Sequence, residues 1–302
     1  MATTSPSPLY KEESYRTLRN RWLRRYLLTE DKSLSAIRGI LFDASQDAFK
    51  QINELETKSN ISSKVRSAQL SAFMGVVRDI NKSTFKSVGS VIRDGQKDSA
   101  AAAVDALLEH EKAVLKRIFK TTDAVEDWGA IQRASAEASV QHVISRYLRT
   151  TIPLSRRVYR SNALSNGYIE RAINSSIATG ASAKDIAERV RSSILPSTPG
   201  GVSYAAMRLG RTELNNAFHA TTIAQSENRP WIDYLQWNLS KLHDQKTGCK
   251  CEEYAELKFF SVGQTPRKPH PQCRCFTTPV LMDWHIFEQN LLSGMFNDYI
   301  AA

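Results

Sequence analysis

Four cysteines lie close together near the end of this 302-residue chain and form its clearest chemical pattern. They come as two pairs, Cys249-x-Cys251 and Cys273-x-Cys275, with His270 three residues before the second pair. In an extended chain, residues i and i+2 project to one face, so each pair is expected to present two sulfur atoms together. Two such pairs brought face to face make a four-sulfur cage of a size that suits tetrahedral zinc. His270 is a candidate to replace one cysteine in a Cys3His set.

The spacing leaves three states open for these cysteines: a structural zinc site, disulfides, or free buried thiols. Structural zinc is the prediction, because disulfides are disfavoured during assembly in a cytoplasm. Disulfides are the alternative, since they can form later in a particle outside the cell. A catalytic zinc needs an open position with an acid or base nearby. Glu252 and His243 are available, but nothing in the sequence fixes them in place, so no catalytic residue is predicted.

The chain is basic, with a net charge of +10, which favours a polyanionic partner. Between Ala138 and Ile169 the sequence has no acidic residue and five arginines, namely Arg146, Arg149, Arg156, Arg157 and Arg160. This cluster resembles no base-reading motif. We therefore expect these arginines to contact double-stranded DNA through its phosphates, without sequence preference.

The composition, 41% hydrophobic and 24% charged, is that of a globular protein. No stretch approaches the roughly 18 consecutive apolar residues of a membrane helix. The N-terminus has no basic patch followed by an apolar core, so it does not resemble a secretory signal. The sequence predicts a protein that is made in a cytoplasm and has no membrane partner.

Long amphipathic helices are predicted over residues 11–120, because apolar residues recur at spacings of three and four and proline is absent. The stretch Gly89–Ser99, with Asp94-Gly95, is expected to form a turn between two of them. Pro153 ends the helical pattern and marks a domain boundary.

Two shorter helices are predicted beyond this proline. Ser182 and Asp185 have the spacing of a capping box, which opens a helix that stops before Pro196. Ser203 is expected to cap a second helix that runs to about Ser226. We expect five polar residues of this helix to form a buried network that connects the helix to the strands: Arg208, Arg211, Glu213, Asn215 and His219.

Short strands are expected over residues 231–239, 257–262 and 273–281. The predicted fold class is mainly α with a small α+β C-terminal domain, in which a helix and a short sheet carry the cysteines. The predicted division is a flexible tail (1–9), a helical N-terminal domain (10–152), a Cys-rich domain (153–281) and a C-terminal amphipathic helix (282–302).

The segment Tyr204–Val280 resembles the phage Mu protein F-like domain of minor head proteins. The matching features are the helical run Arg208–Glu213 with its Arg211-Thr212-Glu213, the segment Trp237–Ser240, the acidic and cysteine turn Asp244–Cys251, and the closing run Pro269-His270-Pro271-Gln272-Cys273-Arg274-Cys275. The region 154–194 is similar to the helices that lead into that domain, so the resemblance covers residues 154–281. The first pair departs from the family, because it is Cys-x-Cys where the family commonly has Cys-x2-Cys or a single Cys.

The resemblance implies a structural, non-enzymatic component of a tailed bacteriophage head. It implies association with the portal inside the capsid, with the major capsid protein or scaffold as further partners. It also implies a role in head assembly and in DNA packaging or ejection, after synthesis in the host bacterial cytoplasm. The alternative from another class is a zinc-dependent nuclease or hydrolase acting on DNA.

Overall fold

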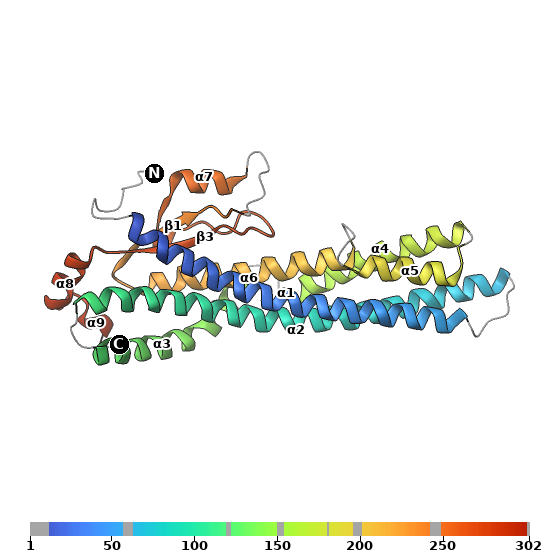
Figure 1. The fold of residues 1–302 in the computed structure, drawn as a ribbon, viewed down its shortest axis with the longest axis horizontal. Coiled ribbons are helices and arrows are strands. Elements are labelled where there is room, and N and C mark those ends of the chain that lie inside the picture. Colours follow the sequence, from blue (N-terminus) through green and yellow to red (C-terminus); the bar gives the residue numbers. More distant parts are fainter. Residues whose placement is uncertain are drawn as a thin grey trace. The chain divides into compact units, whose positions relative to one another are not determined.

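The structure is a computed structural model and describes residues 12–56, 63–118, 122–149, 154–179, 181–195, 201–241 and 249–300. Its elements in chain order are α1 (Glu12–Glu56), α2 (Ser63–Ile118), α3 (Thr122–Arg149), α4 (Leu154–Ala178), α5 (Ala183–Ile194), α6 (Val202–Glu227), β1 (Ile232–Asn238), α7 (Lys250–Leu257), β2 (Phe259–Ser261), η1 (Val262–Gln264), β3 (Phe276–Leu281), α8 (Trp284–Leu292) and α9 (Asn297–Ile300) (Figure 1). The protein is therefore mainly α-helical with one small sheet near the C-terminus, which confirms the predicted fold class. The predicted tail, residues 1–9, lies outside the described residues.

The chain forms two compact units, and neither is continuous in sequence. The first takes its described residues from Met1–Glu30, Gly95–Thr150 and Thr212–Ala302, and the second from Asp31–Asp94 and Thr151–Arg211. Helices α1, α2 and α6 each contribute residues to both units. The units thus combine segments from both sides of Pro153, whereas the sequence analysis divides the chain there.

The predicted turn at Gly89–Ser99 is wrong, because α2 continues through it as one helix of 56 residues. Val88, Ile92 and Ser99 are fully buried on this stretch. A glycine inside a helix costs about 1 kcal/mol relative to alanine, and burial of its neighbours outweighs that cost here. Helix α3 ends at Arg149 and α4 begins at Leu154, and Pro153 between them lies outside the described residues.

Helix α5 begins as the sequence predicts. The Ser182 side chain accepts a hydrogen bond from the Asp185 backbone N–H, and the Asp185 carboxylate accepts one from the Ser182 backbone, so the capping box is present. The predicted cap of α6 is wrong by two positions. This helix starts at Val202, and the Gly201 carbonyl accepts the Ala205 N–H, so Ser203 lies inside the first turn.

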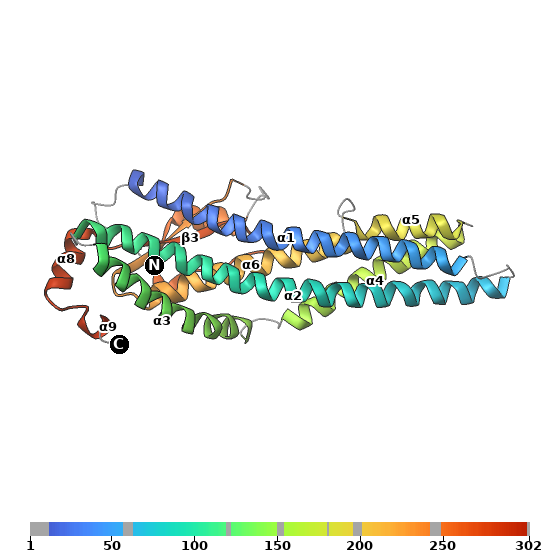
Figure 2. The ribbon, with the colours of Figure 1, turned by 60° about the horizontal axis from the view of Figure 1, so that its bottom comes forward.

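In the second unit, α4 and α5 lie side by side (Figure 2). Gly210 allows two other helices of this unit to approach closely. A Cβ atom added at Gly210 would lie 2.8 Å from the Cδ1 atom of Ile37 and 3.4 Å from a methyl group of Leu34. Leu34 and Ile37 belong to α1, and Gly210 belongs to α6. The two helices therefore pack here without room for a methyl group. Across the same unit, Arg78 of α2 pairs with Glu170 of α4.

The sheet has the order β2-β1-β3 with both pairings antiparallel. In the register, Leu235 of β1 lies opposite Phe260 of β2 and Pro279 of β3. The alternating burial predicted for this segment fails at its C-terminal half, where every residue from Leu235 to Asn238 is buried. A central strand covered on both faces has no solvent face to alternate with.

Aromatic residues form the core of the first unit. Trp22 and Tyr26 of α1 pack against Phe218 of α6, with ring centroids 6.3 and 5.2 Å away, and Ile232 and Phe276 of the sheet join them. Because this core joins α1, α6 and the sheet, it positions the start of β3, which directly follows Cys275.

The single C-terminal helix predicted over 282–302 is wrong, since the segment forms two short helices, α8 and α9. Gly294 between them has φ of 78°, a left-handed conformation that ends a helix and that glycine adopts without strain. Phe287 and Phe296 pack against Trp231 on either side of this break.

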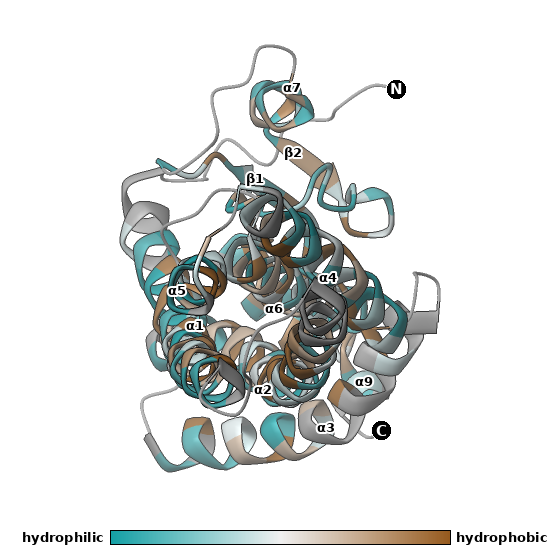
Figure 3. Ribbon diagram, turned by 90° about the vertical axis from the view of Figure 1, so that its right-hand side faces the viewer, coloured by the Kyte–Doolittle hydropathy of each residue, from teal (hydrophilic) through white to brown (hydrophobic). Residues whose placement is uncertain are grey.

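Polar and apolar residues alternate around α1 and α5, as Figure 3 shows, whereas β2 is apolar. Across the described ranges, no helix combines the length and the apolar character needed to cross a lipid bilayer.

Candidate metal centre

The first cysteine pair lies at the start of a helix. Cys249 is the N-cap of α7, and its sulfur accepts a hydrogen bond from the Cys251 backbone N–H at 3.5 Å. Cys249 itself is extended, as predicted, whereas the prediction is wrong for Lys250 and Cys251, which lie in the helix. Cys251 is fully buried in the first turn, whereas Cys249 is half-buried.

The second pair lies in the loop that leads into β3. The Cys273 backbone N–H donates to the His270 carbonyl at 3.4 Å, which closes a turn, and Gln272 in that turn has φ of 60°. Cys275 immediately precedes β3. Since β3 pairs with β1 along its whole length, the sheet fixes the end of this loop.

The two pairs meet, as the sequence predicts. The Cys251 and Cys273 sulfurs lie 3.4 Å apart, and the Cys251 sulfur lies 3.5 Å from Nε2 of His270. The donor atoms of Cys251, Cys273 and Cys275 are all within 4.8 Å of one another, and so are those of Cys249, Cys251 and His270. Cys251 thus belongs to both groups of three.

The separations and the donor chemistry fit a metal ion. None of the four cysteines forms a disulfide. The Cys251 and Cys273 sulfurs, for example, are 3.4 Å apart, against about 2.05 Å in a disulfide bond. With Zn–S near 2.3 Å and Zn–N near 2.0–2.1 Å, a tetrahedral site has S···S edges of about 3.8 Å and S···N edges of about 3.6 Å. Thiolate and imidazole are the ligands that structural zinc sites use. The cluster can therefore hold a metal.

Hydrogen bonds among the buried thiols favour one thiolate. Donation from Cys251, and then from Cys275, lowers the pKa of Cys273, and the nearby Lys268 adds to this effect. The hydrogen bond that Cys251 makes to Cys273 is the largest cause that raises the pKa of Cys251. Thiolates are the form that binds metal, so the cluster holds part of its donor set ready.

The positively charged side chain of Lys268 lies beside this cluster. Its ammonium group donates to the Cys275 carbonyl and lies 5.3 Å from the centre of the Trp237 ring. Burial is the largest cause that lowers the pKa of Lys268, and the neighbouring cysteines oppose it.

Three side chains from the long helices hold the cysteine loop in place. The Thr212 hydroxyl of α6 accepts the Gln272 backbone N–H at 3.0 Å. On α1, the buried Glu30 carboxylate accepts from the Arg274 guanidinium at 3.0 Å. Sequence reasoning missed both contacts, and the second joins residues 244 positions apart, for which the sequence carries no signal.

His219 of α6 is the third anchor. Its Nε2 lies 2.9 Å from the Pro266 carbonyl and its Nδ1 lies 3.2 Å from the Thr277 hydroxyl, so it spans the loop from one end to the other. Burial is the main cause that lowers the pKa of His219 to about 3. The ring is therefore neutral and donates its one N–H to the Pro266 carbonyl.

The other residues of the predicted polar network lie apart from this anchor. Glu213 is fully buried and accepts from the Gln96 amide of α2 at 3.1 Å. Asn215 is 1% exposed, and its amide atoms have no hydrogen-bond partner among the described residues. Arg208 is exposed and Arg211 half-buried, and both belong to the second unit, whereas His219 belongs to the first.

The predicted DNA-contacting arginines lie on two helices. Arg146 and Arg149 belong to the last turns of α3, and their side chains lie outside the described residues. On α4, Arg156 and Arg160 are exposed and Arg157 is half-buried. Tyr159, which was not among the predicted DNA-contacting residues, lies between Arg156 and Arg160 in the sequence and is 71% exposed.

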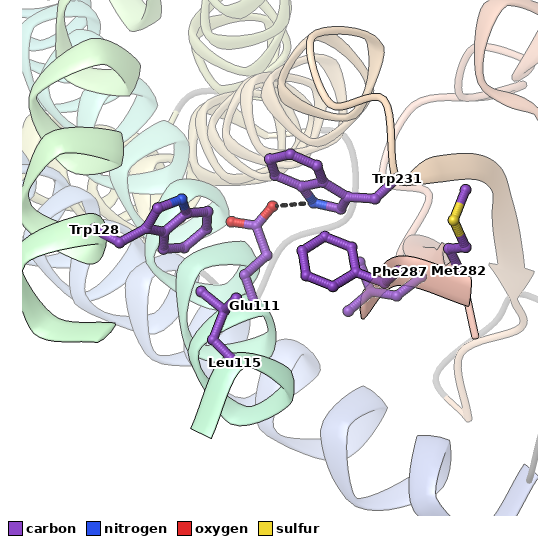
Figure 4. Close-up of a pocket in the computed structure, with 7 residues that line it drawn as sticks. Glu111, Leu115, Trp128, Trp231, Met282 and Phe287 are labelled. Atoms are coloured by element: carbon purple, nitrogen blue, oxygen red, sulfur yellow. Dashed lines mark hydrogen bonds between the residues drawn. The ribbon is translucent and has the colours of Figure 1, made fainter. Parts of the chain in front are cut away.

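A buried ion pair occupies a second polar site that the sequence did not reveal. The Glu111 carboxylate of α2 accepts from the Arg229 guanidinium at 2.6 Å. It also accepts from the Trp231 indole at 2.8 Å, the hydrogen bond drawn in Figure 4. Burial is the largest cause that raises the pKa of Glu111. The pocket beside this carboxylate has an apolar lining, formed by Leu115, Trp128, Trp231, Leu281, Met282 and Phe287. It is a core feature of the first unit.

Of the acid and base considered for a catalytic zinc, the structure describes only the acid. Glu252 is exposed on α7, and His243 lies outside the described residues.

Comparison of the chain with family models, with curated proteins and with solved structures finds no match in any of the three.

Proposed function

We propose that this chain is a structural minor head protein of a tailed bacteriophage. In this proposal it enters the capsid interior with the portal, next to the major capsid protein or scaffold, and assists head assembly and DNA packaging or ejection. Its metal cluster holds a structural zinc ion that fastens the cysteine loop to α7.

One contact carries the proposal. The resemblance to the Mu F-like domain rests on two motifs, the Arg211-Thr212-Glu213 run and the His270–Cys275 run, which are weak evidence separately. The hydrogen bond from the Gln272 N–H to the Thr212 hydroxyl joins them. Motifs that share one folded site support a common origin better than motifs that are merely present in one chain.

A structural zinc site suits a protein that is built into a particle. Cys251, Cys273 and Cys275 are each at most 3% exposed, so a metal bound to their sulfurs has little access to a substrate. Closed four-ligand zinc sites contribute folding energy, whereas catalytic ones keep an open position.

Purified particles test the proposal. Mass spectrometry of immature and mature heads should detect the chain, and affinity purification of the tagged chain from infected cells should recover the portal protein. A variant with Cys273→Ser should enter fewer heads than the wild type, whereas Ser293→Ala, on the exposed C-terminal segment, should enter as many. Absence of the wild-type chain from both kinds of particle would overturn the proposal.

The non-enzymatic assignment has its own test. The zinc-loaded chain, supplied with duplex and single-stranded DNA, should release no cleaved product. Metal-dependent cleavage that disappears in Glu252→Gln would favour the zinc nuclease instead.

A further inference from the structure

The cluster offers five donors, although a tetrahedral metal takes four. Cys251, Cys273 and Cys275 form one group of mutually close sulfurs, and all three are at most 3% exposed. Cys249 and His270 each lie close to Cys251 but share no such group with Cys273 or Cys275. The three buried sulfurs are therefore the inner ligands, and the fourth position falls to Cys249 or His270.

His270 presents a ligand nitrogen to Cys251, the cysteine that both groups share. Its Nε2 lies 3.5 Å from the Cys251 sulfur, close to the S···N edge of about 3.6 Å in a tetrahedral zinc site. Its Nδ1 lies 2.9 Å from the Pro271 carbonyl, which can only accept, so Nδ1 carries the proton and Nε2 presents its lone pair. Metal-bound histidines commonly use their second nitrogen in this way.

Cys249 has a different role in the structure. Its sulfur caps α7 by accepting the Cys251 N–H, and its side chain is half-buried at the outer side of the cluster. His270, by contrast, shares one closed turn with Cys273 through the Cys273 N–H bond to its carbonyl. The same turn therefore carries His270 and one of the three buried cysteines.

Charge points to the same choice. Three thiolates and a neutral histidine leave a zinc site with one net negative charge, whereas four thiolates leave two. Lys268 contacts the cluster with one positive charge, and Arg274 is already paired with Glu30. A buried site is stabilised when its net charge is matched.

We infer that the metal ligands are Cys251, His270, Cys273 and Cys275, and that Cys249 stays a free, partly exposed thiol beside the bound metal. The inference rests on the metal-binding role proposed above and adds which donors perform it.

Cadmium-113 NMR of the full-length chain, loaded with one equivalent of cadmium, tests the donor set directly. The chemical shift should be that of three sulfurs and one nitrogen. In the zinc-loaded chain, iodoacetamide followed by peptide mass spectrometry should modify Cys249 and leave the other three cysteines protected.

Two variants separate the possible results. Cys249→Ser should bind zinc with unchanged affinity in a chelator competition. His270→Ala should bind at least about tenfold more weakly, because loss of even an outer-shell partner costs about 10–100-fold. His270→Cys should restore tight binding and shift the cadmium signal to that of four sulfurs, which also controls for misfolding.

A four-sulfur signal in the wild type, or loss of zinc in Cys249→Ser, would overturn this ligand set while leaving the metal clip intact. A wild-type chain that binds neither zinc nor cadmium would remove the clip itself, and the inference with it.

Discussion

At the scale of single residues, the cysteine loop is fixed by side chains that lie far from it in sequence. Thr212 holds Gln272 in a left-handed backbone conformation, and Glu30 holds Arg274. The loop that carries two inner sulfurs is thus ordered by hydrogen bonds to α6 and α1. Preorganisation of this kind lowers the entropy that metal binding must overcome.

Thr212→Val tests this anchor. Valine keeps the shape of threonine but leaves the Gln272 N–H without its partner, so we expect a loss of about 1 kcal/mol in the free energy of unfolding. Zinc affinity, measured by chelator competition, should fall as well. Thr212→Ser, which keeps the hydroxyl, should match the wild type in both measurements. An equal zinc affinity in Thr212→Val would show that the anchor does not prepare the site.

His219 makes stability depend on pH. Burial holds its pKa at about 3 in the folded chain, against about 6.5 when unfolded. Above about pH 6.5, His219 is neutral in both states and does not affect the free energy of unfolding. As the pH falls from there toward 3, the unfolded chain binds a proton that the folded chain does not, so the free energy of unfolding decreases by up to about 1.4 kcal/mol per pH unit.

The comparison with His219→Gln isolates this effect, because glutamine keeps hydrogen-bonding groups but does not titrate. Both chains should be unfolded in denaturant with chelator present, so that metal release does not contribute. Between pH 8 and pH 5, the wild type should lose free energy of unfolding relative to the variant. Parallel pH dependence of the two chains would contradict the buried neutral histidine.

At the scale of elements, local patterns were predictable and tertiary effects were not. The Ser182–Asp185 capping box is a local pattern, and the sequence predicted it correctly. The Asp94-Gly95 turn is also a local pattern, but burial along α2 overrides it. Helix α7 was missed because its cap is Cys249, which has no place among the usual N-cap residues. The meeting of the two cysteine pairs was predictable, since shared metal chemistry requires it.

Gly210 gives a sharp test of helix packing in the second unit. Gly210→Ala places a methyl group 2.8 Å from the Ile37 Cδ1 atom, so we expect a loss of about 1–3 kcal/mol in unfolding free energy. Gly39→Ala is the matched control, because nothing lies within 4 Å of a Cβ atom there. It should stabilise the chain by up to about 1 kcal/mol through helix propensity. Equal effects at the two glycines would contradict the close approach of α1 and α6.

At the scale of the whole molecule, the positive charge and the exposed arginines of α4 support phosphate contact with DNA. The chain carries a net charge of +10, and Arg156 and Arg160 face solvent. Each phosphate contact contributes a slope of about −0.9 to the dependence of log affinity on log salt.

The double variant Arg156→Ala/Arg160→Ala should therefore bind duplex DNA more weakly, with a salt slope smaller by about two. The loss should be the same for unrelated sequences, as fluorescence anisotropy with two oligonucleotides can show. Lys50→Ala/Lys97→Ala removes as much charge elsewhere and should reduce the slope less. If the two double variants lost the same amount of DNA affinity and salt slope, the net charge of the chain, and not direct contact by Arg156 and Arg160, would account for DNA binding.

Electron microscopy of an intact particle tests most directly whether this chain is a component of a phage head, as we propose. A map of the portal-proximal head interior should contain density that accommodates the long helices and the cysteine-bearing sheet. A particle whose portal region and capsid interior are fully accounted for by other chains would contradict it.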